Sequence, residues 1–156
     1  MSNQVNDVKI EIGEDLASIK PIIFNSNSLY QMDDILYYYR ENMQSATRSK
    51  KVFLWNGPEL IGKHIEKKID MNSYNMKEQL NRVITHQLFL VVKSQFNRKE
   101  KYVTIKNNIL MNLNNEYYKD AVSKCKYSIK YLKGILAKIC LKYKLVFLMY
   151  IISKIY

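Results

Sequence analysis

The first pattern of polar and apolar positions along the chain is an alternation, and it predicts extended structure near the N-terminus. Residues 8–12 alternate between apolar and charged side chains, which is the period of a strand with one buried face. Residues 13–15 interrupt the alternation, and residues 19–24 form a second extended candidate. Because proline cannot donate a hydrogen bond to a sheet, Pro21 would make this second strand an edge strand. The segment 1–27 is therefore expected to be extended or β.

The next pattern has helical spacing. Ser28 and Gln31 are placed as in a capping box, in which each side chain binds a free backbone N–H near the start of a helix. A helix is therefore expected to begin at Ser28, after a polar loop over residues 25–28. The apolar residues that follow recur at intervals of three and four, which places them on one side of an amphipathic helix. They are Leu29, Met32, Leu36, Tyr39 and Met43.

A short strand and a turn are predicted near the only tryptophan. Residues 52–55 are rich in β-branched and aromatic side chains, which favours a strand after the basic connector 48–51. Residues 56–58 then turn the chain. Trp55, beside this turn, is expected to belong to the core, and its alternative role is an anchor for a binding partner.

Two helices are predicted in the middle of the chain. Proline suits the first position of a helix, where its missing N–H would have no partner, so a short helix should run from Pro58 to about Ile69. Gly62 weakens this helix. A second helix should begin at Asn75, end near Phe96 and form the centre of the core. Its apolar positions are Leu80, Val83, Ile84, Leu88 and Val91.

Helical spacing continues through the rest of the chain. A helix is favoured over a strand at residues 102–117, where Tyr102, Ile105, Ile109, Leu113 and Tyr117 fit one face. From residue 122 onward a long apolar stripe predicts one amphipathic helix or a helix pair, with Gly134 as its one bend. The stripe is Val122, Cys125, Ile129, Leu132, Leu136, Ile139, Tyr143, Val146 and Tyr150.

These patterns predict a mainly α protein, a single-domain bundle of about five helices with a small N-terminal β element. A chain of 156 residues buries roughly 70% of its unfolded surface on folding, which is enough for one core. Only 4 glycines and 2 prolines interrupt the sequence, which favours long helices. Within the domain 1–156, residues 1–27 form the acidic extended segment, 28–118 the helical core and 119–156 the long basic amphipathic C-terminal helix or helix pair.

The charge of the chain is distributed unevenly. Residues 1–47 contain 3 Lys and Arg against 7 Asp and Glu, whereas residues 119–156 contain 9 lysines and the single acid Asp120. Such an imbalance is more typical of contact with nucleic acid or a membrane surface than of an enzyme pocket. Lysines outnumber arginines by 21 to 4, a bias that an AT-rich genome produces and that suggests a viral or mobile-element protein. The positions of the lysines therefore carry more weight than their number.

The leading functional hypothesis is nucleic-acid binding without sequence preference. Lys126, Lys130 and Lys133 are spaced by four and three, so on a helix they would form one basic row beside two tyrosines. Lysines that neutralise phosphates release counterions, and tyrosine rings stack on unpaired bases. Because lysine lacks the planar fork with which arginine binds guanine, charge and shape should dominate recognition. The candidate binding residues are Lys124, Lys126, Tyr127, Lys130, Tyr131, Lys133, Lys138 and Lys142.

Three alternatives remain open. The lysines can be a solvated helix face, neutralised in part by Asp7, Glu11, Glu14 and Asp15. The protein can instead be a helical-bundle module, such as a viral or mobile-element accessory factor, that holds a host protein in a groove between its helices. Peripheral contact with an anionic membrane is the third alternative, since residues 145–152 are apolar all round and follow a lysine-rich segment. These 8 residues are far short of the about 20 that span a bilayer and are also typical of the centre of a bundle.

The sequence offers no motif for catalysis, a metal or a cofactor. Cys125 and Cys140 lack CxxC spacing, and His64 and His86 lack the HExxH pattern of a zinc site. Asp33 and Asp34 are an adjacent acid pair near a predicted helix start, where negative charge complements the helix dipole, so they do not indicate a metal site. Glycine-rich phosphate loops and nucleophile turns are also missing. We therefore expect a non-enzymatic protein without a cofactor that is intracellular, in cytoplasm or nucleus, because no secretory signal is recognised.

Overall fold

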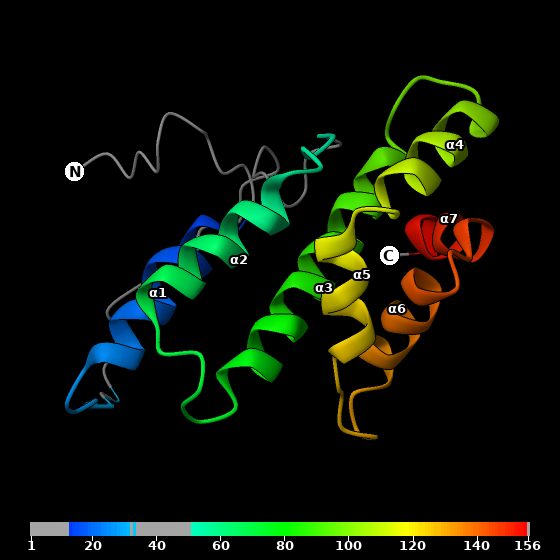
Figure 1. Ribbon diagram of the computed structural model, residues 1–156. Helices are drawn as coiled ribbons and strands as arrows, with labels where there is room; N and C mark the ends of the chain where they lie inside the picture. The colour runs from blue at the N-terminus through cyan, green and yellow to red at the C-terminus, as the bar shows by residue number, and fades with distance from the viewer. Residues whose placement is uncertain (1–12, 32, 34–50, 156) are drawn as a thin grey trace.

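The computed structural model describes residues 13–31, 33 and 51–155, and these residues form seven helices and no strand (Figure 1). The mainly α class is confirmed, whereas five helices is too low a count. The helices are α1 (Glu14–Asn25), α2 (Gly57–Lys68), α3 (Met76–Gln95), α4 (Tyr102–Asn112), α5 (Glu116–Lys124), α6 (Leu132–Lys142) and α7 (Val146–Ile155).

Helix α3 is at the centre of the arrangement. It packs against α2 on one side and against α5, α6 and α7 on the other, and α1 lies outside, against α2 (Figure 1). Helix α4 contacts α3 and α7. With 20 residues, α3 is about 30 Å long, so it reaches both groups of helices.

One cluster of buried side chains joins all seven helices. Ile84, Leu88 and Val92 recur every four residues along α3 and are almost completely buried. Ala17 of α1 and Met149 of α7 belong to the same cluster. Burying an aliphatic side chain of this kind contributes about 1.5–3 kcal/mol, so the cluster is the main source of stability.

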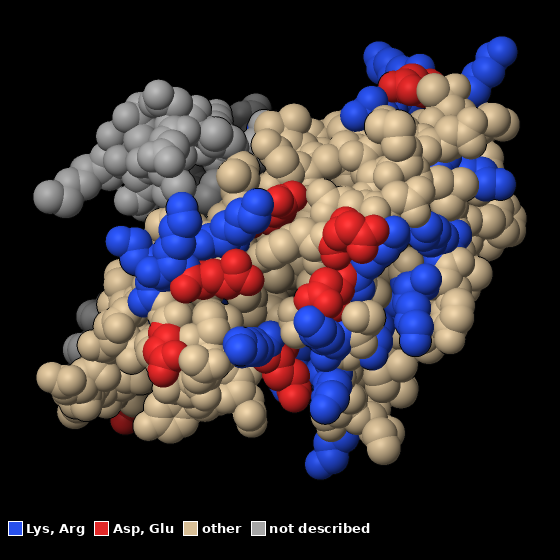
Figure 2. Space-filling view, in the orientation of Figure 1, with Lys and Arg blue, Asp and Glu red and all other residues tan. Residues whose placement is uncertain are grey.

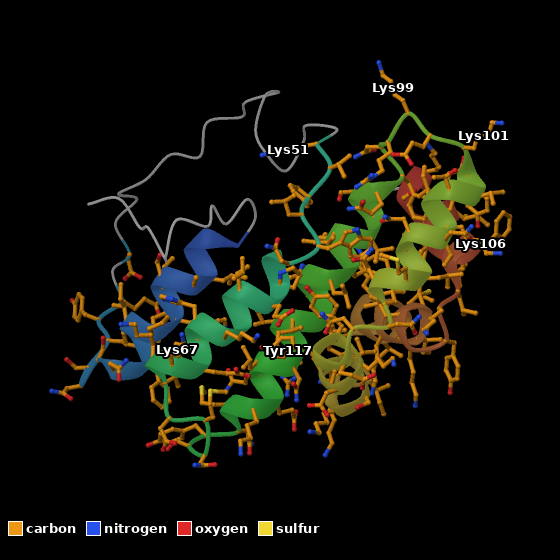
Figure 3. All side chains as sticks on the ribbon, turned by 45° about the horizontal axis from the view of Figure 1, so that its top comes forward. Lys51, Lys67, Lys99, Lys101, Lys106 and Tyr117 are labelled. Carbon is orange, nitrogen blue, oxygen red and sulfur yellow. The ribbon has the colours of Figure 1, made fainter. Side chains whose placement is uncertain are left out.

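Helices α2 and α3 begin and end close to the bounds predicted from the sequence. Pro58 lies in the first turn of α2, as expected, and Gly62 does not interrupt the helix. A β-carbon added at Gly62 would meet the hydroxyl of Tyr117, a residue labelled in Figure 3. Asn75 and Glu78 have the spacing of a capping box, but the start of α3 has a different structure. Asn75 has a left-handed backbone (φ 58°) and makes no side-chain cap, while Glu78 forms an ion pair with Arg82.

The strand predicted at residues 19–24 is wrong, because these residues lie within α1. Pro21 is inside the helix, where proline removes a hydrogen bond and costs about 3 kcal/mol. Packing on α2 offsets this cost, since Ala17 is buried and Phe24 packs against the core. Tertiary contacts therefore override the β preference of the local sequence. The first predicted strand, 8–12, lies outside the described residues.

The helix predicted to begin at Ser28 does not begin there. Residues 28–31 are not helical, and Leu29 and Tyr30 are exposed. Without a neighbouring element to bury Leu29, the spacing of Ser28 and Gln31 alone does not nucleate a helix. The rest of the predicted stripe, Met32, Leu36, Tyr39 and Met43, lies outside the described residues.

The strand predicted at residues 52–55 is also wrong. The segment is fixed to α3 by two buried polar side chains. The Phe53 N–H donates to Oγ of Ser94 at 2.9 Å, and Nε2 of Gln95 donates to the Phe53 carbonyl at 2.9 Å. Since both backbone groups of Phe53 have partners on α3, the segment needs no neighbouring strand.

Trp55 has a packing role. Its indole Nε1 donates to Oδ1 of Asn108 at 2.9 Å, and its backbone carbonyl accepts a hydrogen bond from the Tyr118 hydroxyl. The ring also packs against the core cluster. Trp55 therefore joins the segment before α2 to α4 and α5.

The helix predicted over residues 102–117 is divided into α4 and α5. The break lies at residues 113–115, where Oδ1 of Asn115 accepts the Tyr117 N–H at 2.8 Å and caps α5. An asparagine at this position satisfies a backbone donor that a continuous helix would bond internally. Local capping thus creates the division.

The C-terminal third does not form one long helix with a bend at Gly134. Gly134 lies inside α6, and the chain leaves the helical conformation at residues 125–131 and 143–145. At the second break Lys144 has a left-handed backbone (φ 52°), and its ammonium donates to Oδ1 of Asn114 at 2.5 Å. The predicted helix or helix pair is therefore the end of α5 followed by α6 and α7.

Candidate nucleic-acid interface

The predicted lysine row lies on the α5–α6 connector, residues 125–131, and at the start of α6. The connector is not helical, so the spacing of Lys126, Lys130 and Lys133 does not place them on one helix face. This part of the prediction is wrong. Cys125 is completely buried and has an extended backbone (φ −60°, ψ 132°), so it ends α5 and fixes the connector against the core.

Two of the predicted lysines are occupied by local partners. Lys124 forms an ion pair with Asp120 at 2.8 Å. Lys138 is half-buried, and its ammonium donates to the Cys125 carbonyl at 2.5 Å. The first contact lies within α5 and the second joins α6 to the start of the connector, so these two lysines are less available to an external ligand than the others.

Three other lysines form what we call the basic surface: Lys126, Lys130 and Lys142. All three are exposed, and none has a carboxylate within 4 Å in the part of the chain that the structure describes. Lys142 lies over the Tyr143 ring, 5.6 Å from its centroid. Lys133, in the first turn of α6, is exposed as well. The sequence contains no acidic residue after Asp120.

The charges on one face of the molecule are mixed over α2 and α5 and predominantly basic toward α6 (Figure 2). Ion pairs explain the mixed region, where Glu59 binds Lys63 at 2.6 Å and Glu116 binds Lys119 at 2.8 Å. The predicted neutralisation by the N-terminal acids is not tested at Asp7 and Glu11, which lie outside the described residues. The carboxylate of Asp15 accepts the Leu16 N–H at 2.8 Å.

The two tyrosines of the predicted site differ in accessibility. Their rings are 5.4 Å apart at an angle of 46°, and both lie against Gly134. Tyr127 is half-buried, and its hydroxyl donates to the Arg82 carbonyl at 3.4 Å. Burial raises the pKa of Tyr127 above its usual value. Tyr131 keeps 48% of its surface exposed, so it is the tyrosine that a base could reach.

A groove of about 410 Å³ opens beside the connector, between α1 and α3. Two basic side chains and one histidine line it together with both tyrosines. Burial lowers the pKa of His86, which favours the neutral imidazole. The buried Oε1 of Gln87, on the wall of this groove, has no hydrogen-bond partner among the described residues. The polar lining is Lys20, Arg82, His86, Gln87, Tyr127, Ser128 and Tyr131.

Sequence reasoning did not find Lys20 and Arg82. They come from α1 and α3, far in the sequence from the connector, and the first of these helices was predicted as a strand. Only the packing of α1 on α2 and of α2 on α3 brings Lys20 to this groove. Neither residue stands in a charge cluster that would have drawn attention.

The part of the predicted apolar stripe that falls in α6 lies on the surface. Leu132 is 71% exposed and Tyr143, just after the helix, is 63% exposed, with Leu136 and Ile139 between them exposed as well. The buried side of α6 consists of mostly small residues instead, namely Gly134, Ala137, Cys140 and Leu141. Because small side chains allow α6 to pack closely on α3 and α5, the bulky face is turned outward. The 3 and 4 spacing places these residues on one side of α6, and that side is the exposed one.

The apolar segment 145–152 is partly buried. Val146 and Met149 belong to the core, whereas Leu145, Phe147 and Ile151 are exposed. The segment is therefore neither buried on all sides, as in the centre of a bundle, nor exposed on all sides. No helix among the described residues is long and apolar enough to cross a membrane.

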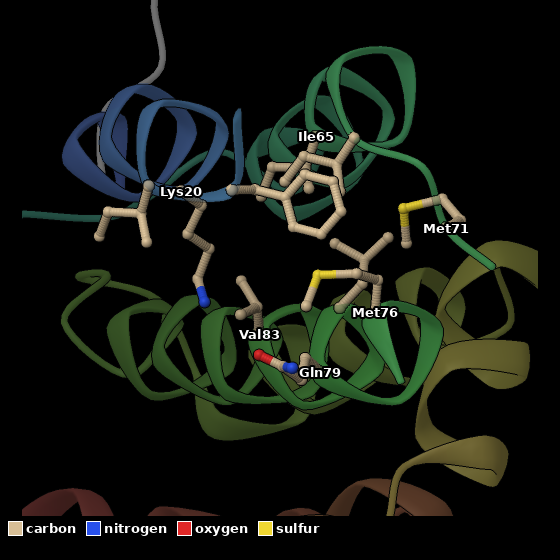
Figure 4. A pocket seen from close by; sticks show the side chains of 10 residues that line it. Lys20, Ile65, Met71, Met76, Gln79 and Val83 are labelled. Carbon is tan, nitrogen blue, oxygen red and sulfur yellow. The ribbon is translucent and has the colours of Figure 1, made fainter. Parts of the chain in front are cut away.

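An apolar hollow of about 160 Å³ lies between α1, α2 and α3 (Figure 4). Lys20 extends from α1 toward α3 at one end, and Met71 and Met76 lie at the other. Gln79 is the other polar side chain on its wall. The apolar lining is Ile23, Phe24, Ile65, Ile69, Met71, Met76, Leu80 and Val83.

The described residues bring together no group of three or more metal-ligating side chains. Cys125 and Cys140 are both free and buried, and burial raises the pKa of Cys140, which disfavours the reactive thiolate.

No protein-family description, curated protein or solved structure is detectably similar to this chain.

Proposed function

We propose that this protein binds nucleic acid through its basic surface, without reading base sequence and without catalysing a reaction. The observation that supports the proposal is the exposure of Lys126, Lys130 and Lys142 without carboxylate partners in the described residues. A lysine that is already neutralised gains little from a phosphate, whereas an uncompensated one releases a counterion when it binds. Lys124 and Lys138 contribute less, because each has a local partner.

Single-stranded nucleic acid is the favoured ligand. The half-exposed ring of Tyr131 borders the groove that contains Lys20 and Arg82. An unpaired base can stack on this ring while a neighbouring phosphate contacts Lys20, whereas Arg82 is already paired with Glu78. A duplex keeps its bases stacked within the helix and gains only the phosphate contacts.

The proposal is tested by fluorescence anisotropy of labelled single- and double-stranded oligonucleotides over a range of salt concentrations. The test variant carries Lys126→Gln, Lys130→Gln and Lys142→Gln. Its matched control carries Lys99→Gln, Lys101→Gln and Lys106→Gln, which remove the same charge from exposed positions around the start of α4 (Figure 3). We expect the test variant to lose affinity by at least about tenfold at low salt and the control to lose less.

Equal losses in the two triple variants would show that net charge alone drives binding and would contradict the proposed surface. Failure of the unmodified protein to bind any oligonucleotide at low salt would contradict the function itself. All six lysines are exposed, so neither triple variant should unfold the helices. Circular dichroism of each variant checks this.

A second candidate function is binding of another protein, and the apolar hollow between α1, α2 and α3 favours it. Its volume of about 160 Å³ is enough for one large apolar side chain, as in helix-in-groove recognition. Ile23, at its edge, is 49% exposed. Ile23→Asp would place a charge at the edge, so binding of a protein partner should be lost while oligonucleotide binding persists.

A further inference from the structure

Helix α6 presents an outward face that nothing in the described structure covers. We call Leu132, Leu136, Ile139 and Tyr143 the α6 apolar face. Their spacing of four, three and four places them on one side of the helix axis, and all four are exposed. Isolated exposed apolar residues are normal on a protein surface, but a contiguous line of four large ones marks a contact site.

Packing fixes this face in its outward orientation. The opposite side of α6 carries Gly134, where the rings of Tyr127 and Tyr131 lie against the backbone. Ala137 and Cys140 continue that side and are buried. A rotation of α6 that buried the leucines would drive their bulk into the space of these small residues, so the apolar face cannot turn inward.

The surroundings of the α6 apolar face are cationic. Lys142 lies beside Tyr143, and Lys130 precedes the helix by two positions, both exposed. The nearest acid before the helix in the sequence is Asp120, and none follows it. Lysine side chains lay their methylene stems along apolar surface and extend their charge outward to an anionic layer.

We infer that the α6 apolar face rests on an anionic membrane surface, with its leucines and isoleucine among the acyl chains and its lysines among the headgroups. An exposed helix face with aliphatic side chains bordered by lysines is the arrangement of interfacial helices. Eleven residues give a helix about 16 Å long, which suits a helix that lies in the interface and not across it.

Charge complementarity favours a membrane over a second copy of this chain. A symmetric contact through α6 would bring two sets of lysines together in a protein whose net charge is +11, and like charges oppose such pairing. No residue of the α6 apolar face lines either of the two hollows described above. The α6 apolar face is therefore not part of those grooves, in which a peptide could be held. A broad anionic layer matches both its apolar and its basic parts.

The test is binding to vesicles of phosphatidylcholine alone and of phosphatidylcholine mixed with phosphatidylglycerol, measured by sedimentation. The test variant carries Leu132→Ser, Leu136→Ser and Ile139→Ser. The matched control carries Leu54→Ser, Val103→Ser and Met111→Ser, which are also exposed but lie outside α6. We expect binding to the anionic vesicles only, reduced about tenfold or more in the test variant and unchanged in the control.

A second measurement does not depend on the stability of the serine variant. Leu136→Trp places an indole on the α6 apolar face, and Val103→Trp places one on α4 as a control. Brominated lipid should quench the fluorescence of the Leu136→Trp variant by a larger fraction than it quenches the fluorescence of the unmodified protein, which contains only Trp55. The Val103→Trp variant should show no such additional quenching. Bromine atoms quench only fluorophores that enter the acyl region.

Three results would overturn the inference: no sedimentation with anionic vesicles at low salt, equal sedimentation of the test variant and the unmodified protein, or absence of quenching at position 136. If the serine variant instead loses an acidic protein partner while vesicles fail to bind, the face is a protein-docking surface. Oligonucleotide binding by the serine variant separates this inference from the proposed function, because all lysines of the basic surface are retained in it.

Discussion

The ring of Tyr131, at the end of the α5–α6 connector, lies against the backbone of Gly134 in the first turn of α6. A β-carbon at position 134 would be 2.3 Å from Cδ1 of Tyr131 and 2.9 Å from Cδ1 of Tyr127. Ring carbons that close to a side chain are sterically forbidden. The glycine therefore sets the path of the connector and the outward orientation of α6.

Gly134→Ala is expected to destabilise the protein by about 1–3 kcal/mol, because both rings must move to admit the methyl group. The change would otherwise favour a helix, since alanine exceeds glycine in helix propensity by about 1 kcal/mol. The free energy of unfolding in urea measures the balance. Gly57→Ala is the matched control, since nothing lies within 4 Å of its added β-carbon, and a loss of stability equal to that of Gly134→Ala would contradict the steric explanation.

Gln95→Met is expected to cost about 1–3 kcal/mol of stability. The buried amide donates to the carbonyls of Phe53 at 2.9 Å and Val91 at 3.2 Å, and methionine leaves the Phe53 carbonyl buried without that donor. Urea unfolding gives the measurement. In the control, Gln79→Met, the amide is bound to an exposed backbone carbonyl, so its loss should cost less than about 0.5 kcal/mol.

The unfolding free energy should decline above about pH 10, and Tyr118 should contribute to this decline. Burial raises the pKa of Tyr118 above its ordinary value of 10.0. Because the folded state holds this proton more tightly than the unfolded chain, the contribution is fully present below pH 10 and is lost as pH rises beyond it. Urea midpoints from neutral to alkaline pH should show a shallower alkaline decline for Tyr118→Phe, and equal declines would rule out this contribution.

The salt dependence of oligonucleotide binding should change by a similar amount for each lysine of the basic surface. Removing one phosphate contact lowers the slope of log affinity against log salt by about 0.7 for single strands. Single Lys126→Gln and Lys130→Gln variants should each show this decrease. Lys124→Gln should show a smaller one, because Lys124 is paired with Asp120, and a decrease as large as that of Lys126→Gln would show that the pair opens on binding.

Local sequence determined those helices in which the helix-start residues and the apolar spacing agree with the burial that the fold provides. Pro58 lies in the first turn of α2, close to the predicted start, and the apolar spacing from Leu80 to Val91 belongs to α3, whose inner face is buried. The identities of the candidate lysines were also available from the sequence. Their exposure was not, nor was the contact of Lys138 with the Cys125 carbonyl, which forms only after the connector is folded.

Tertiary structure decided which apolar stripe is buried and which backbone conformation prevails. Residues 19–24 became helical because packing of Ala17 and Phe24 outweighs the local preference that Pro21 and the isoleucines express. The stripe of α6 was visible in the sequence, but periodicity cannot distinguish a buried face from an exposed one. That choice depends on the close approach that Gly134, Ala137 and Cys140 permit, since a helix is packed most tightly where its side chains are smallest.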